Sequence, residues 1–155
     1  MKEPPKFVAE YRKVQERFNL PQLEKLRQVF QFELEEISDI NQMRDEISEK
    51  LFDFVERVIE PLIWSGHHTH LMERDMLSEK EMQELFELYK KIQALRWRSN
   101  MLMIRPNADE SARWIHKSWE FWADLETTMT RLCRKFSISW ENLRFKNEKV
   151  DYNVA

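Results

Sequence analysis

Two histidines and a glutamate recur at intervals of three residues near the middle of the chain. They are His67, His70 and Glu73, directly after the single glycine of the sequence. Imidazole nitrogens and carboxylate oxygens are common zinc ligands, so this set is a candidate metal site. A structural zinc site needs four ligands in fixed geometry, and histidine-bearing loops also bind adventitious metal. The alternative is an exposed polar loop, which we take as the default.

Four carboxylates form a second candidate set for metal chemistry: Glu33, Glu36, Glu49 and Asp53. They fall on consecutive expected helices, and paired carboxylates on facing helices hold Mg²⁺ against a triphosphate. The set resembles the acidic pattern of the all-α nucleotide pyrophosphohydrolases of the MazG type, although its second pair is one residue wider than that family's. The resemblance implies a metal-dependent nucleotide hydrolase. The alternative is a solvated acidic helix face.

A basic and aromatic stretch near the centre of the chain could contact nucleic acid: Lys90, Lys91, Arg96, Trp97, Arg98 and Arg105. A second basic group follows at Arg131, Arg134 and Lys135. Cations bind phosphates and aromatic rings stack on bases. However, the acids of the surrounding segments leave them nearly neutral, and no glycine-containing helix-turn-helix is visible. We therefore do not expect a nucleic-acid partner, and weak binding stays an alternative.

Composition excludes several classes of protein. The chain has 155 residues, a formal net charge of -3, one glycine and one cysteine. Glycine-rich phosphate loops and dinucleotide-binding folds need backbone at positive φ, which a single glycine cannot supply. Cys133 falls on an apolar helix face, where we expect a buried and inert thiol. A single cysteine forms no intramolecular disulfide and the N-terminus lacks the apolar run of a signal peptide, so we expect a cytoplasmic protein. No stretch of about 20 apolar residues is present, so we expect no membrane span.

Apolar residues recur at helical spacing along most of the chain, which predicts an all-α, mostly antiparallel bundle of five to six helices. Three helix starts carry capping pairs, in which a side-chain oxygen and a residue three positions later satisfy unpaired backbone donors: Asp39 with Gln42, Ser78 with Glu81, and Asn107 with Glu110. The three long helices begin near Asn41, Glu79 and Ala108. The expected helices are 4–18, 21–38, 41–64, 79–104 and 108–136, with a short sixth from 139.

Proline and glycine set two of these boundaries. Pro61 removes a backbone donor, which predicts a kink or an early end in the last turn of the third helix. Gly66 is expected to close that helix in the left-handed conformation. Residues 1–145 then form a single domain, followed by a polar tail at 146–155 that is either frayed or docked in an extended form.

The fifth expected helix is apolar over more than half of its circumference and carries Trp114, Trp119 and Trp122. One interpretation is an aromatic core, and the other is a contact surface for a partner. Two charges also break the apolar faces of the fourth and fifth helices, Arg96 and Glu126. Each charged group either reaches solvent along its aliphatic stem or makes a buried polar contact or an ion pair between subunits.

These patterns lead to a functional expectation. We predict a non-enzymatic interaction or scaffold protein that binds a protein partner or self-associates as a homo-oligomer, with no catalytic residue and no cofactor. The expected contact surface is formed by Trp114, Trp119, Trp122, Arg96 and Glu126. The alternatives are the metal-dependent pyrophosphohydrolase and the weak nucleic-acid binder.

Overall fold

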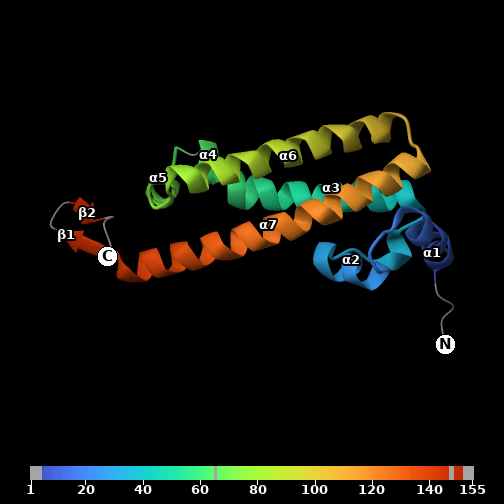
Figure 1. The fold of residues 1–155 in the computed structure, drawn as a ribbon, viewed down its shortest axis with the longest axis horizontal. Helices are drawn as coiled ribbons and strands as arrows, with labels where there is room; N and C mark the ends of the chain where they lie inside the picture. The colour runs from blue at the N-terminus through green and yellow to red at the C-terminus, as the bar shows by residue number, and fades with distance from the viewer. Residues whose placement is uncertain (1–4, 65, 147–148, 152–155) are drawn as a thin grey trace. The chain divides into compact units, whose positions relative to one another are not determined.

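The computed structural model describes residues 5–64, 66–146 and 149–151. It confirms the all-α helical bundle (Figure 1). The helices are α1 (Lys6–Phe18), α2 (Leu23–Phe30), α3 (Ile40–Phe54), α4 (Glu60–Trp64), α5 (His68–Asp75), α6 (Glu79–Ile104) and α7 (Ala108–Asn142). A 3₁₀ turn, η1 (Leu34–Glu36), precedes α3, and a π-helical turn, η2 (Val55–Ile59), follows it. Strands β1 (Arg144–Lys146) and β2 (Lys149–Asp151) pair antiparallel after α7.

The residues group into two compact units that share the two longest helices. Unit 1 comprises residues 1–54 and 91–122, and unit 2 comprises residues 55–90 and 123–155. The C-terminal part of α6 and the N-terminal part of α7 therefore belong to unit 1. The remaining parts of both helices belong to unit 2.

Capping explains where the long helices begin. The amide of Glu81 donates to Ser78 Oγ at 3.1 Å, and the Ser78 amide donates back to the Glu81 carboxylate at 2.9 Å. This reciprocal pair is the predicted capping box of α6. Asn107 likewise accepts the amide of Glu110 at the start of α7, at 3.0 Å. The three long helices thus begin within a residue or so of their expected positions.

The second helix is shorter than predicted. It ends at Phe30, and Gln31 closes it in the left-handed conformation at φ 52°. Phe30 and Phe32 are both buried. Residues two apart point about 200° apart on a helix, so a continuing helix would have exposed Phe32. The left-handed turn at Gln31 breaks this periodicity, and both rings are buried. Only the turn η1 follows before α3.

Pro61 distorts the third helix as predicted. A proline in a helix interior has no N–H for the carbonyl four residues earlier, and its ring collides with that carbonyl. Directly upstream, the chain widens from α-helix into η2 and then continues as α4. A π turn of this kind accommodates an irregular hydrogen-bond ladder without ending the helix.

Three expectations about the boundaries were wrong. The positive φ values that the structure describes are at Asn19 and Gln31 and not at Gly66. The expected loop at His67–His70 lies largely in helix α5, because the segment after Gly66 has no further breaker and contains good helix formers. The expected sixth helix is the continuation of α7, which meets no glycine or proline before Asn142.

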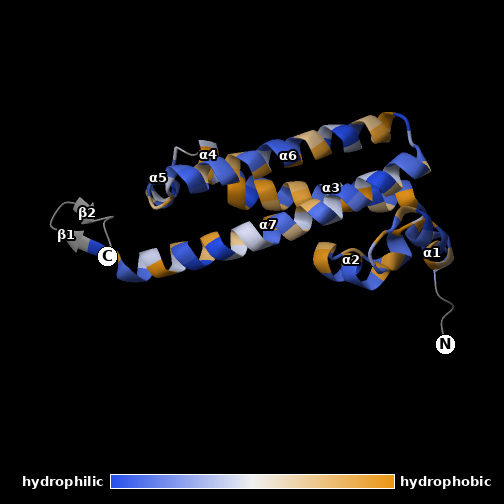
Figure 2. Ribbon diagram, viewed as in Figure 1, coloured by the Kyte–Doolittle hydropathy of each residue, from blue (hydrophilic) through white to orange (hydrophobic). Residues whose placement is uncertain are grey.

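Unit 1 has an aromatic and aliphatic core. Hydrophobic residues recur among hydrophilic ones along the ribbons of the helices (Figure 2). The ring of Phe30 on α2 contacts Trp119 and Trp122 of α7 at centroid distances of 6.4 and 5.7 Å. The hydroxyl of Tyr11 donates to the carbonyl of Pro21 at 2.5 Å, and burial raises the pKa of Tyr11. The core side chains of α3, α6 and α7 include Met43, Ile47, Leu51, Ile92, Leu95, Ile115 and Phe121.

Unit 2 is held by its own apolar side chains and by polar contacts between α6 and α7. Leu85 and Leu88 on α6 and Leu125 and Leu132 on α7 are buried. Arg131 forms an ion pair with Glu84 at 2.5 Å, and Lys135 forms another with Glu81. These contacts fix how the two helices pair within this unit.

Candidate docking surface

The part of α6 in unit 1 has two apolar faces on opposite sides. Ile92, Leu95 and Ser99 are buried against the core of unit 1. About half a helical turn away, Trp97, Met101 and Ile104 have exposed fractions of 60%, 62% and 80%. At about 100° per residue these three side chains share one stripe, with the exposed Ala94 one turn earlier. We call Ala94, Trp97, Met101 and Ile104 the α6 docking face.

Trp97 is positioned by a neighbouring arginine. The guanidinium of Arg96 lies 5.2 Å from the centre of a Trp97 ring and 4.3 Å from the centre of the Phe52 ring of α3. Both distances are within the range of cation–π attraction. Arg96, predicted as a contact residue, is therefore half-buried between two rings beside the docking face.

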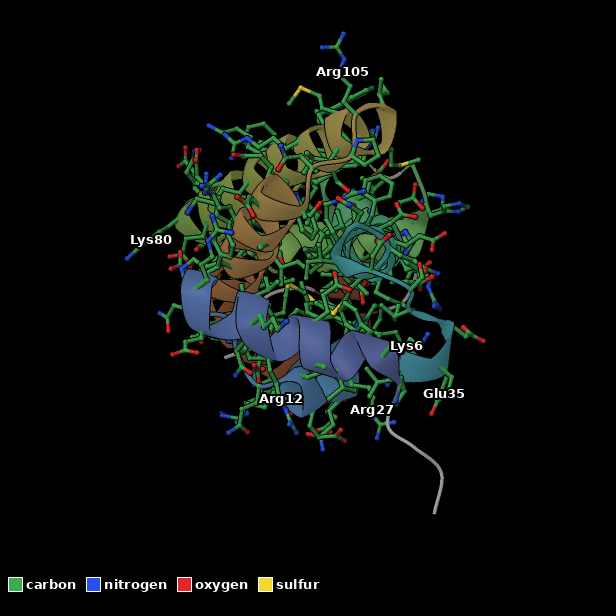
Figure 3. All side chains as sticks on the ribbon, turned by 90° about the vertical axis from the view of Figure 1, so that its right-hand side faces the viewer. Lys6, Arg12, Arg27, Glu35, Lys80 and Arg105 are labelled. Atoms are coloured by element: carbon green, nitrogen blue, oxygen red, sulfur yellow. The ribbon has the colours of Figure 1, made fainter. Side chains whose placement is uncertain are left out.

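A row of cations borders the same face. Lys91 and Arg98 are exposed and lie seven residues apart on one line of α6. The exposed Arg105 follows after seven more residues, directly after the last residue of the helix, where its amide still donates to the carbonyl of Met101 at 2.9 Å. None of the three has an ion pair within the described part of the chain. Arg105 points away from the ribbon at the end of α6 (Figure 3). The face is apolar along its centre and positive along one edge.

The tryptophans expected on the contact surface lie elsewhere. Trp114 is 4% exposed, and its indole N–H donates to the carbonyl of Leu95 at 2.8 Å. Trp119 and Trp122 are half-buried, and Trp122 also contacts Phe54 at 6.4 Å. The wide apolar face of α7 is therefore covered within unit 1, because α2 and α3 pack against it in addition to α6.

Glu126 is exposed on α7 in unit 2, where it lines a shallow groove with Thr127, Thr130, Arg131 and Arg134. Cys133 is exposed as well, contrary to the expected buried thiol. The expectation failed because the apolar arc of α7 is covered fully only in its N-terminal part. Toward its C-terminus only a narrower stripe, which includes Met129 and Leu132, is buried.

The metal candidates do not converge among the described residues. The rings of His67 and His70 are 5.9 Å apart, but Glu73 accepts a hydrogen bond from the indole of Trp140 at 3.0 Å. In the described part of the chain, no three His, Cys, Asp or Glu side chains are grouped so that they could hold a metal ion. Neither the histidine set of His67, His70 and Glu73 nor the exposed carboxylates Glu33, Glu36, Glu49 and Asp53 form such a group.

Sequence reasoning missed a buried arginine. Arg44 is 2% exposed and donates to the carbonyl of Ser99 at 2.9 Å and to Ser111 Oγ at 3.2 Å. Ser111 in turn donates to Asn41 at 2.6 Å, and burial lowers the pKa of Arg44. The helical spacing could have indicated its burial, because Arg44 is in line with Ile40, Ile47 and Leu51 on the apolar face of α3. Its partners lie far away in the sequence.

No protein-family model, curated protein or solved structure matches this chain. Among the helices that the structure describes, none combines the length and apolar composition needed to cross a bilayer.

Proposed function

We propose that this protein is a non-enzymatic interaction module that binds another polypeptide through the α6 docking face. A single observation carries the proposal: Trp97, Met101 and Ile104 are large, apolar and each at least 60% exposed on one face of a helix whose opposite face is core. Covering one such side chain gains about 1.5–3 kcal/mol. Contiguous exposed apolar residues with a polar border are typical of protein-binding surfaces.

The proposal moves the expected contact surface from α7 to α6. Trp114, Trp119 and Trp122 of α7 pack within unit 1, whereas the indole of Trp97 is 60% exposed and available to a partner. Tryptophan and arginine are the residues that most often dominate binding energy at interfaces. Trp97 beside Arg96 and Arg98 therefore forms the expected centre of the contact.

Native mass spectrometry of the tagged protein, gently purified from its own host, tests this function. We expect a complex containing the chain with another protein or with further copies, and we expect its loss in the double variant Trp97→Ser, Ile104→Ser. The matched control is Trp64→Ser, Ile138→Ser, which removes two apolar side chains of similar size and 64% and 57% exposure in unit 2. A bare chain in every sample, or equal loss in both variants, would contradict the proposal.

A further inference from the structure

The α6 docking face has the residue spacing of a coiled-coil seam. Ala94, Trp97, Met101 and Ile104 follow one another at intervals of three, four and three residues. In heptad notation they occupy positions a, d, a and d, which insert between the side chains of a second helix. The preceding d position holds Lys90, so the seam begins at Ala94.

The cations that border the face all occupy one heptad position. With Trp97 at d, Lys91 and Arg98 are at e, and Arg105, directly after the last helical residue, continues the same register. The corresponding g positions hold the neutral amides of Gln93 and Asn100, and no acidic residue occurs between Glu87 and Asp109. Side chains at e and g flank the seam and select the partner by charge.

We propose, on the basis of the function proposed above, that the occupant of this face is an amphipathic helix of another protein with apolar a and d positions and acidic residues along its flank. In a parallel pair the e positions of α6 would meet acidic g positions of the partner, and in an antiparallel pair they would meet acidic e positions. Either orientation pairs each of the three cations with a carboxylate while the apolar seam is covered.

A second copy of this chain fits the same face poorly. In an antiparallel pair of α6 helices, the e positions of both copies would place cations against cations. In a parallel pair, the e cations would meet the amides of Gln93 and Asn100. Like charges across such a seam disfavour pairing, and neutral amides give no ion pairs, so charge directs this face toward an acidic partner.

A nucleic-acid strand also fits less well. Phosphates would satisfy Lys91, Arg98 and Arg105, but the backbone would leave Met101 and Ile104 in water. An acidic amphipathic helix satisfies both the cations and the apolar seam.

Two designed helical peptides of equal length test the charge of the occupant. Both carry leucine at a and d, and one carries glutamate and the other lysine at every e and g position. We expect the full-length protein to bind the glutamate peptide at least tenfold more tightly than the lysine peptide by fluorescence anisotropy. The triple variant Lys91→Glu, Arg98→Glu, Arg105→Glu should invert this preference.

Two comparisons separate the local charge of the face from the total charge of the protein. The control Lys80→Glu, Lys117→Glu, Arg134→Glu makes the same change in charge at exposed positions elsewhere, and it should keep the preference of the unmodified protein. The variant Trp97→Ser, Ile104→Ser should lose both peptides. Circular dichroism and thermal unfolding of all variants establish that they remain folded.

Several results would contradict the acidic helix as the occupant but would leave the proposed interaction function intact. These are equal affinity for the two peptides, binding of neither peptide, or tighter binding of a labelled 20-nucleotide single strand than of the glutamate peptide. A complex that contains only copies of this chain and is lost on Trp97→Ser, Ile104→Ser would have the same effect. Failure of the native mass measurement would instead remove the interaction function itself.

Discussion

The Nε–H of Arg44 donates a hydrogen bond of 3.2 Å to Ser111 Oγ and thereby joins α3 to α7 inside unit 1. Two further hydrogen bonds from the same guanidinium reach the carbonyl and the hydroxyl of Ser99 on α6. One buried cation thus connects the three long helices through neutral oxygens. A buried charge is costly unless every partner is in place, so this network favours one arrangement of the helices.

This geometry predicts an asymmetry between two substitutions. Arg44→Met removes the buried charge and keeps much of the volume, so we expect a loss of less than about 1.5 kcal/mol in the free energy of unfolding. The double variant Ser99→Ala, Ser111→Ala leaves the cation with fewer acceptors and should cost about 2 kcal/mol or more. Urea unfolding measures both values. A larger loss for Arg44→Met would contradict the network.

The placement of the tryptophans predicts a second difference. Trp114→Ala opens a cavity in the core of unit 1 and removes a hydrogen bond to Leu95, so it should cost about 3–5 kcal/mol. Trp97→Ala removes an exposed side chain with one cation–π contact and should cost less than about 1 kcal/mol. The losses are measured from the urea midpoints of unfolding, provided that the dependence of the free energy of unfolding on urea concentration is the same for all variants. Equal losses would mean that Trp97 is covered in the isolated chain.

Local rules were sufficient for the class of fold and for most of the long helices. The capping pairs at Ser78 and Asn107 act within four residues, and the apolar periodicity of α6 and α7 is continuous, so both starts were predictable. The early end of α2 depends on burial of Phe30 and Phe32 together. The contacts of Phe30 with Trp119 and Trp122 of α7 contribute to this requirement, and they have no counterpart in local sequence.

The docking face was only half predictable. The sequence marks the stretch around Trp97 and Arg98 as basic and aromatic, but from that pattern alone it suggests only weak nucleic-acid binding as an alternative, and not a contact surface for a protein. The sequence of α6 contains two apolar stripes, one through Leu95 and one through Trp97, and only tertiary neighbours decide which stripe is covered. Arg44 poses the same problem, because its partners Ser99 and Ser111 are small polar residues without a distinguishing local pattern.

The ion pair between Lys135 and Glu81 predicts a dependence of stability on pH. Burial acts to raise the pKa of Glu81, but hydrogen bonds from Lys135 and Ser78 outweigh it and hold the pKa below its ordinary value. A carboxylate with a lowered folded-state pKa stabilises the protein above its unfolded-state pKa, and this contribution is lost as pH falls through the lowered value.

Thermal unfolding at a series of pH values from 7 to 3 measures this contribution. The unmodified protein should melt at a higher temperature than Glu81→Gln near neutral pH, and the difference should shrink in acid. Glu79→Gln, at an exposed position on the same helix turn, should show a much smaller difference. A difference for Glu81→Gln that does not change with pH would exclude the carboxylate charge as its source.

The exposure of Cys133 predicts that the native protein reacts with a thiol reagent. Cys133 is the single cysteine of the chain and lies on the exposed part of α7 in unit 2. An accessible thiol reacts without unfolding, so Ellman's reagent should modify one thiol per chain in native buffer at a rate close to that of the chain in urea. Cys133→Ser supplies the blank. Reaction only after unfolding would contradict the exposed position, and protection that disappears on dilution would show that a second copy covers this part of α7.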